Sequence, residues 1–491
     1  MCFRERLWRD SSARRTSKSF DRESYIIMCP RVTASLTDFS LHYNNYITIN
    51  IYTTMSDMNI TTNKTLNNNK LGSGLPPAMP RKLPFLVSHL IKNVPYVCRP
   101  SVANGVFPAL GIHLNQVKFE LIDGTEKEAT FMSVNIAPQS SGKSAVNKPV
   151  EYILADIVEH DKVNREREQE WKDSMNKKGA NKEKPKRPDD LCVQVLVSDM
   201  TNAAFVQRMN DAKGKYLYTN LEEIELLRQL HTNGTKDVGK IICLCFDNGM
   251  YGQERVGTQS VTARVALRWN WNASTTILKG QKFFRGSLVD GTLSRLNIST
   301  IIPDKTKPFV YGKYDEQFAA DLKPYIDRLN EARGTVVCRE ALRMAKRMLD
   351  KCQREGDLTG DDVYQDLSYR AVTIAYLKAM VLYIAHGMQW SKEIEKFAEW
   401  SLNYDLWCKC HYFGDDMTDE KQKERVVHKR GRQNMLEMLP EQFTEDQVVE
   451  VRRRLGLDDD AKNMLRVWVY RKYIQKDNDS GIYRKYLNKK C

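Results

Sequence analysis

The run from Ala137 to Ser144 combines residue types that can hold the phosphates of a nucleotide. Gly142 lets the backbone approach a ligand closely, Lys143 offers a point charge to the β and γ phosphates, and the Ser144 hydroxyl can hold Mg²⁺. The predicted cofactors are therefore ATP and Mg²⁺. The residues predicted to bind the nucleotide are Ala137, Pro138, Gln139, Ser140, Ser141, Gly142, Lys143 and Ser144.

Such a loop works only between a strand and a helix, because its backbone N–H groups and the helix N-terminus must face the same phosphates. Residues 131–136 are strand-like, and a helix is predicted from about Lys143 to Ile157. The strict pattern of a phosphate-binding loop (P-loop) begins with glycine, whereas this chain has Ala137. Many such loops need an unusual backbone angle at that position, so alanine weakens the motif.

Hydrolysis also requires an acidic group that holds Mg²⁺ or orients the attacking water. Asp199 follows the strand-like run 193–197 and is predicted, with Ser144, as a metal ligand. The alternative is that Asp199 or Thr201 simply caps the helix that follows.

A second acidic pair, Glu222 and Glu223, follows the strand-like run 215–221. We favour Glu223 as the catalytic acid and Glu222 next, because the carboxyl edge of an open α/β sheet forms the ligand crevice. The alternative is a solvated first turn of a helix, where acidic residues are also favourable.

Further groups could complete a catalytic site. A third strand is predicted over 262–269, and an amide of Asn270 or Asn272 after it could sense the γ-phosphate or simply form a turn. Arg295 could reach into the site of a neighbouring subunit as an arginine finger, and a surface salt bridge is its alternative. The predicted catalytic set is Lys143, Glu223, Glu222 and Arg295.

Composition shifts along the chain predict five segments. The Asn- and Thr-rich start is either a flexible basic arm or non-native sequence upstream of Met55 or Met58. The segments are a leader over 1–75, a helical lead-in over 76–128, an α/β domain over 129–310 with a charged insert over 159–190, a helical region over 311–433 and a final module over 434–491.

Residues 80–300 resemble an uncharacterised family of P-loop proteins from bacterial mobile elements and phages, often labelled primase-helicase-like. The resemblance implies a RecA-like or AAA+-like parallel-sheet ATPase that acts in DNA replication or mobilisation. The blocks that carry it are Ala137 to Ser144, Ser198-Asp199-Met200-Thr201, Glu223-Ile224-Glu225, Phe246-Asp247-Asn248-Gly249, Arg255 and Asp290 to Arg295.

The last 58 residues are typical of a winged helix. A capping box at Thr444 opens one helix, a second helix follows, and a hairpin near its end would be the wing. Residues 421–491 hold 18 Lys and Arg against 11 Asp and Glu, a surplus of seven. The predicted DNA-contacting residues are Lys462, Arg466, Arg471 and Lys472. Docking of another protein is the alternative.

The whole chain is basic, with a net charge of +14 and a pI near 9.1, which favours a polyanionic partner. No run approaches the roughly 18 apolar residues of a membrane helix. The 11 scattered cysteines indicate reduced thiols in a cytoplasmic protein. We therefore expect a homo-oligomeric ATPase, for which a ring is one arrangement, that remodels or unwinds DNA. The alternative is a nucleotide-switched DNA-binding scaffold with little hydrolysis.

Overall fold

The computed structural model describes residues 72, 74–177, 185–230, 238–254, 262–288, 290–429, 435–436, 438–455, 460–470, 472–477 and 480–486. Of the predicted leader, residues 1–71 and 73 lie outside this set. The eight cysteines in the described part form no disulfide.

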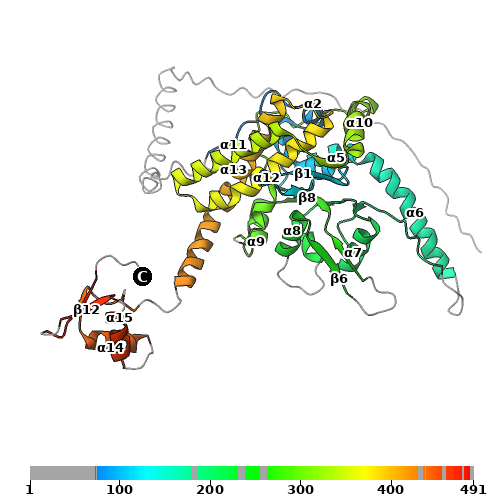
Figure 1. Ribbon diagram of the computed structural model, residues 1–491. Coiled ribbons are helices and arrows are strands. Elements are labelled where there is room, and N and C mark those ends of the chain that lie inside the picture. Colours follow the sequence, from blue (N-terminus) through cyan, green and yellow to red (C-terminus); the bar gives the residue numbers. More distant parts are fainter. Residues whose placement is uncertain are drawn as a thin grey trace, which may run out of the picture. The chain divides into compact units, whose positions relative to one another are not determined.

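A five-stranded parallel sheet forms the centre of the fold (Figure 1). Its order is β4-β5-β8-β3-β9, so β3 lies between β8 and β9. Ile136 at the end of β3 pairs with Thr275 at the end of β8. The predicted α/β class with a parallel sheet is confirmed. The strands are β3 (Met132–Ile136), β4 (Val195–Leu196), β5 (Leu217–Leu221), β8 (Trp269–Thr275) and β9 (Asn297–Ser299).

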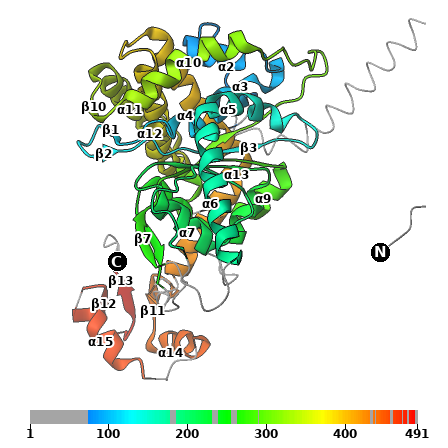
Figure 2. The ribbon, with the colours of Figure 1, turned by 90° about the vertical axis from the view of Figure 1, so that its right-hand side faces the viewer.

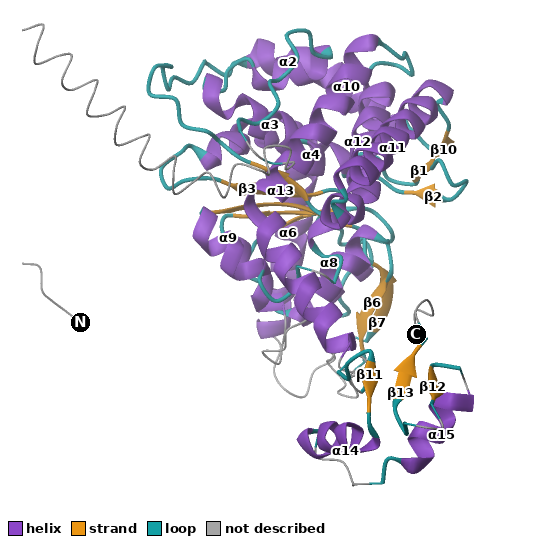
Figure 3. Cartoon of the chain, turned by 90° about the vertical axis from the view of Figure 1, so that its left-hand side faces the viewer, coloured by secondary structure: helices purple, strands orange, loops and turns teal. Residues whose placement is uncertain are grey.

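Helices cover both faces of this sheet (Figure 3). On one face lie short N-terminal helices, two of which begin with a proline in the first turn, where its missing N–H costs nothing. They are α2 (Phe85–Ile91), η1 (Tyr96–Cys98), α3 (Arg99–Gly105) and α4 (Phe107–Gly111).

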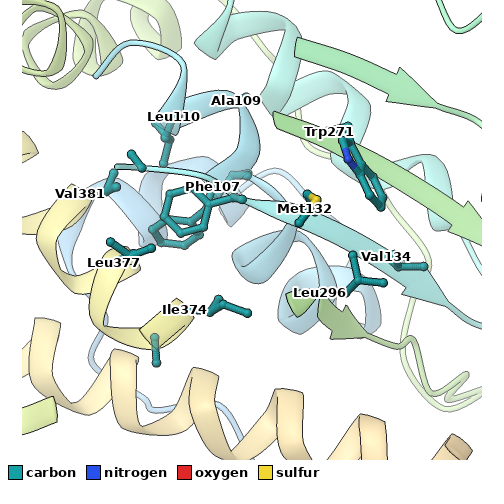
Figure 4. Packing of buried hydrophobic residues seen from close by; sticks show 14 of the residues in the cluster. Phe107, Ala109, Leu110, Met132, Val134, Trp271, Leu296, Ile374, Leu377 and Val381 are labelled. Carbon is teal, nitrogen blue, oxygen red and sulfur yellow. The ribbon is translucent and has the colours of Figure 1, made fainter. Parts of the chain in front are cut away.

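The helical region predicted over 311–433 packs over these short helices. Figure 4 shows Phe107 and Leu110 of α4 packed between Met132 of β3 and Leu377 and Val381 of α12. This packing makes the helical region part of the same core as the sheet. Its elements are α10 (Glu316–Glu331), β10 (Gly334–Val336), α11 (Arg339–Thr359), α12 (Asp362–Ala385) and α13 (Lys392–Lys429).

The crossover segments lie on both sides of the sheet: η2 and α5 lie beside α3, α4 and α10, whereas α7 and α9 lie on the other side (Figure 2). The helix after β3 is not continuous, because a 3-10 turn and a break at Leu154 divide it. The segments are η2 (Lys143–Val146), α5 (Asn147–Ile153), α6 (Ala155–Lys177), α7 (Asn202–Asp211), η3 (Ile224–Leu230), α8 (Val238–Phe246), α9 (Ile277–Phe284), η4 (Leu293–Arg295) and an antiparallel pair, β6 (Met250–Gln253) with β7 (Ala263–Ala266).

Helix α6 is the charged helix predicted in the insert, but it has a buried polar face. Asp161 accepts hydrogen bonds from the backbone N–H groups of Gln194 and Val195, and Arg165 donates to the Val195 carbonyl. Glu168 pairs with Arg208 of α7 at 2.6 Å. Most of the helix is exposed, as expected for a charged insert, but this face holds the edge strand β4. Residues 178–184 of the predicted insert lie outside the described part.

Helix α13 covers the opposite edge of the sheet. Asp405 accepts from the backbone N–H of Ile298 at 2.6 Å, and Tyr404 donates to the Thr300 carbonyl at 2.8 Å. Asp405 is itself paired with Lys409 at 2.7 Å, and both are almost completely buried. The outer side of β9 is thereby bonded to side chains.

Two strands that precede β3 in the chain belong to a smaller sheet. Strands β1 (Val117–Glu120) and β2 (Glu126–Lys127) form an antiparallel hairpin, and β10 joins β1 in parallel. The hairpin turn is the predicted Asp123-Gly124: Thr125 donates to Asp123, and Gly124 has φ +78.

The C-terminal module has its own hydrophobic cluster, with Phe443, Val448, Leu465, Ile474 and Tyr483 among its members. The predicted capping box is present, since Thr444 and Gln447 exchange hydrogen bonds at the start of α14. The antiparallel sheet has the order β11-β13-β12. The elements are β11 (Gln442–Phe443), α14 (Glu445–Arg454), α15 (Lys462–Tyr470), β12 (Ile474–Lys476) and β13 (Tyr483–Lys485).

Candidate functional site

The loop after β3 contains two residues in the left-handed region. Ser140 has φ +57 and Gly142 has φ +86, with Ser141 between them. Such alternation is the backbone pattern from which anion-binding nests are built. Ala137 is buried and has no positive φ, so alanine fits its position without backbone strain. The departure from glycine therefore does not disturb the loop.

Lys143 begins the 3-10 turn and folds back over the loop. Its Nζ donates to the Pro138 carbonyl at 2.9 Å, and the Ser141 hydroxyl donates to the same oxygen at 2.8 Å. The next side chain, Ser144, is exposed. Burial lowers the pKa of Lys143, and the negative charge of Glu223 opposes that shift. Lys143 and Glu223 therefore lie within electrostatic reach of each other.

Glu222 and Glu223 follow β5, two strands away from β3. Glu222 is exposed, whereas the Oε2 atom of Glu223 is sheltered and accepts no hydrogen bond from the described residues. That oxygen lies 3.7 Å from Nζ of Lys279 on α9. Of the two acids, Glu223 is the one whose charge acts on Lys143, and its catalytic role stays a prediction. Its neighbour Lys279 was missed by the sequence analysis. The sequence signal for Lys279 is its place four residues after β8, at the same sheet edge.

Two asparagines join the acid-bearing strand to the helix after the loop. Asn220 at the end of β5 donates to the side-chain carbonyl of Asn147 at the start of α5, at 3.2 Å. In the sheet, β8 lies between β5 and β3, the strand that precedes α5 in the chain. A displacement of α5 would therefore also displace β5, the strand that Glu223 follows.

The predicted amide sensor has to be corrected. The strand predicted over 262–269 is β7 in part, and the parallel strand is β8, so Asn270 and Asn272 lie within a strand rather than after one. Asn270 is buried and donates to the backbone carbonyls of Pro108 and Ala129. It holds α4 against the sheet.

Asp199 and Arg295 are not gathered around Lys143. Asp199 is exposed and follows β4, which is three strand spacings, or about 14 Å, from β3. Arg295 precedes β9 and so lies at the amino edge of the sheet, where its Nη2 is 2.9 Å from Asp247 and its Nη1 donates to the Gly291 carbonyl. Only 12% of the Arg295 side chain is exposed. Its action on a neighbouring subunit stays a prediction.

The segment after β9 lies against the loop. The ring of Phe309 packs on Gly142 and meets the ring of Tyr311 edge-on, with centroids 5.8 Å apart. Beyond it, Gly312 N–H donates to the Asn93 carbonyl at 2.8 Å, and Cys98 contacts the loop from another side. Phe309 and Tyr311 are about half exposed, so they offer apolar surface next to the candidate phosphate site.

The predicted DNA-contacting residues lie on or after α15. Lys462 and Arg466 are four residues apart on one face of the helix, and both are exposed. Lys472 is exposed with φ +56, and Arg471 lies outside the described residues. The same helix also exposes Tyr470, at 87%, so its surface is both basic and apolar.

The chain matches no protein-family model and no curated protein. Within the described residues one helix, α12, is long and apolar enough to cross a membrane, and 83% of its most apolar 18-residue window is buried inside the structure. The site is therefore defined by its own geometry: a loop with two left-handed residues, a lysine and a sheltered carboxylate at one sheet edge.

Proposed function

We propose that the chain is an ATPase with a RecA-like or AAA+-like core. The observation that carries this proposal is that Lys143 and Glu223, which follow separate strands of a parallel sheet, lie within electrostatic reach of each other, beside a loop with two left-handed residues. Ligand sites of open α/β sheets form at this carboxyl edge. Strand β8 lies between the two strands.

The residues present fit MgATP. The loop N–H groups and Lys143 would hold the β and γ phosphates, and the exposed Ser144 hydroxyl would be one ligand of Mg²⁺, which keeps several waters of its own. Bound Mg²⁺ would neutralise charge on the phosphates. Glu223 would orient the attacking water, because its Oε2 is sheltered and accepts no hydrogen bond from any described residue.

We further propose that ATP turnover acts on DNA, within a cytoplasmic homo-oligomer that serves a mobile element. The net charge of +14 supports a polyanionic partner. The C-terminal module supports a winged helix, because two helices and a three-stranded antiparallel sheet surround a separate core. In that arrangement α15 would enter the major groove with Lys462 and Arg466.

A scaffold that binds ATP but hardly hydrolyses it is the second candidate. It is favoured by the contact between Glu223 and Lys279, which partly neutralises the carboxylate. Steady-state ATP hydrolysis with and without single-stranded DNA separates the two candidates. A DNA-stimulated rate supports the motor, and binding without turnover supports the scaffold.

The nucleotide site itself is tested by Lys143→Ala in binding calorimetry with ATP. We expect binding to be lost, because charge-assisted contacts contribute about 1.5–3 kcal/mol each and no described neighbour replaces the ammonium. Lys148→Ala, an exposed lysine on α5, is the matched control and should bind normally. Unchanged ATP affinity in Lys143→Ala would refute the site.

A further inference from the structure

A second cavity lies away from the phosphate loop. It has a volume of about 470 Å³ and is formed by the β1–β2 hairpin, the turn after α8 and the first turns of α12. The hairpin precedes β3 in the chain, which places the cavity toward the amino edge of the sheet. Its volume falls in the range of about 300–1,000 Å³ that is typical of small-molecule sites.

Three cations lie at this cavity, and two of them share one carboxylate. Lys127 and Arg370 line it, and Arg295 stands directly behind its wall. Asp247 lies 3.5 Å from Nζ of Lys127 and 2.9 Å from Nη2 of Arg295. Arg370 donates to the Ser294 hydroxyl at 3.0 Å instead of to a carboxylate.

Two other carboxylates of the wall have cationic partners of their own, Lys118 for Glu126 and Arg268 for Glu128. Asp123 accepts a hydrogen bond from the neutral Tyr369 hydroxyl and keeps its negative charge. Lys127, Arg295 and Arg370 therefore carry three positive charges against the two negative charges of Asp247 and Asp123, a surplus of one.

The cations that make up this surplus are partly buried, and burial disfavours their charged forms. Burial lowers the pKa of both Lys127 and Arg370, and the charge of Arg295 lowers that of Arg370 further. The Nε of Arg295 is buried and has no hydrogen-bond partner among the described residues. Buried charges are normally paired, so the site lacks an anion.

We propose that this cavity binds the phosphate group of a small phosphorylated ligand, with Lys127 and Arg370 in contact and Arg295 supporting them from behind. A guanidinium matches two phosphate oxygens at once, which favours phosphate over a simple halide. The exposed Asp123 on the hairpin carries a negative charge that disfavours an extended nucleic-acid strand. The proposal does not depend on hydrolysis of ATP at the loop.

The experiment is calorimetry of the full chain with pyrophosphate at fixed ionic strength, in a Lys143→Ala background that removes the loop site. We expect binding to persist in this background and to weaken at least tenfold when Arg370→Gln is added. Asp247→Asn should instead tighten binding at least threefold, because it removes the carboxylate that competes with the ligand. Arg343→Gln, an exposed arginine on α11, is the control and should have no effect.

The opposite signs expected for Arg370→Gln and Asp247→Asn distinguish a binding site from a structural cluster. Equal weakening by both changes, no effect of Arg370→Gln, or loss of pyrophosphate binding through Lys143→Ala alone would overturn the proposal. A single-stranded oligonucleotide is the second ligand. If it binds more tightly than pyrophosphate and depends on Arg370, the cavity belongs to a nucleic-acid surface and the proposal fails.

Discussion

The ring of Phe309 rests on the backbone of Gly142, so that a Cβ at Gly142 would clash with Cζ of the ring. Gly142 also has φ +86, a conformation that other residues rarely adopt. Two independent constraints therefore require glycine immediately before Lys143. One comes from the shape of the loop and the other from the segment after β9.

Gly142→Ala should lower both stability and ATP affinity. The positive φ alone costs about 1–3 kcal/mol of unfolding free energy, and the clash with Phe309 adds to it. Gly334→Ala is the control, because Gly334 has φ +79 but no atom within 4 Å of its Cβ position. Urea unfolding of Gly142→Ala with and without Phe309→Ala measures the clash. A loss equal to that of Gly334→Ala would show that Phe309 does not constrain the loop.

Glu223→Gln should retain ATP binding and lose turnover by about 100-fold or more, as expected for removal of a catalytic base. The amide has the same size but cannot accept a proton from water. Glu222→Gln is the matched control one residue away, exposed to solvent, and should remain active. Activity in Glu223→Gln together with its loss in Asp199→Asn would transfer the role to Asp199.

Stability should rise with pH above neutrality because of Lys378. This lysine is fully buried, its Nζ donates to Asn104, Asn297 and Ser401, and burial lowers its pKa to about 7. Between that pH and 10.5, the value in the unfolded chain, the unfolded state holds a proton that the folded state has lost. The unfolding free energy therefore increases with pH across this window, and the gain is lost as the pH falls from 10.5 to about 7.

The measurement is the difference in unfolding free energy between the wild type and Lys378→Met from pH 6 to pH 9. The difference should change by up to about 1.4 kcal/mol per pH unit above pH 7. The lost hydrogen bonds add an offset that does not vary with pH. A difference independent of pH would mean that Lys378 stays charged inside the fold.

The isolated module over 434–491 should bind duplex DNA weakly and with strong salt dependence. Each phosphate contact steepens the logarithmic salt slope by about 0.9, so replacing the four predicted residues should reduce it by about three. Arg484→Gln with Lys485→Gln on the wing is the control and should have a smaller effect. Full binding by the fourfold variant of Lys462, Arg466, Arg471 and Lys472 would favour protein docking, to which the exposed Tyr470 is suited.

Much of the sheet could be predicted because its strands are short apolar runs followed by recognisable loops. β3 and β5 lie where the sequence places them, and Glu223 faces Lys143 as the rule for parallel sheets requires. β8 could not be predicted in the same way. Its Asn270 and Asn272 suggest a turn, and only distant partners such as Pro108 and Tyr218 satisfy them inside the core.

The remaining parts of the site come from contacts that have no local signal. Phe309 is more than 160 residues from Gly142 in the chain. Lys279 lies on α9, which only the tertiary structure brings close to Glu223 after β5. Asp161 is surrounded by charges of α6, and nothing in the sequence distinguishes it from its solvated neighbours. Its role depends on the position of β4, which is a property of the tertiary structure.

The bonds that Asp161, Arg165 and Asp405 make along the two outermost strands have a consequence for self-association. An open strand edge is a template on which a second chain can add, and such addition leads to fibrils. Here outward backbone groups at both ends of the sheet are hydrogen-bonded to side chains. Asp161 and Arg165 of α6 bond to the chain at β4, and Asp405 of α13 bonds to the backbone at β9. Copies of this chain are thereby prevented from joining strand to strand at these edges, and a ring of subunits would have to be held together by its helices and loops.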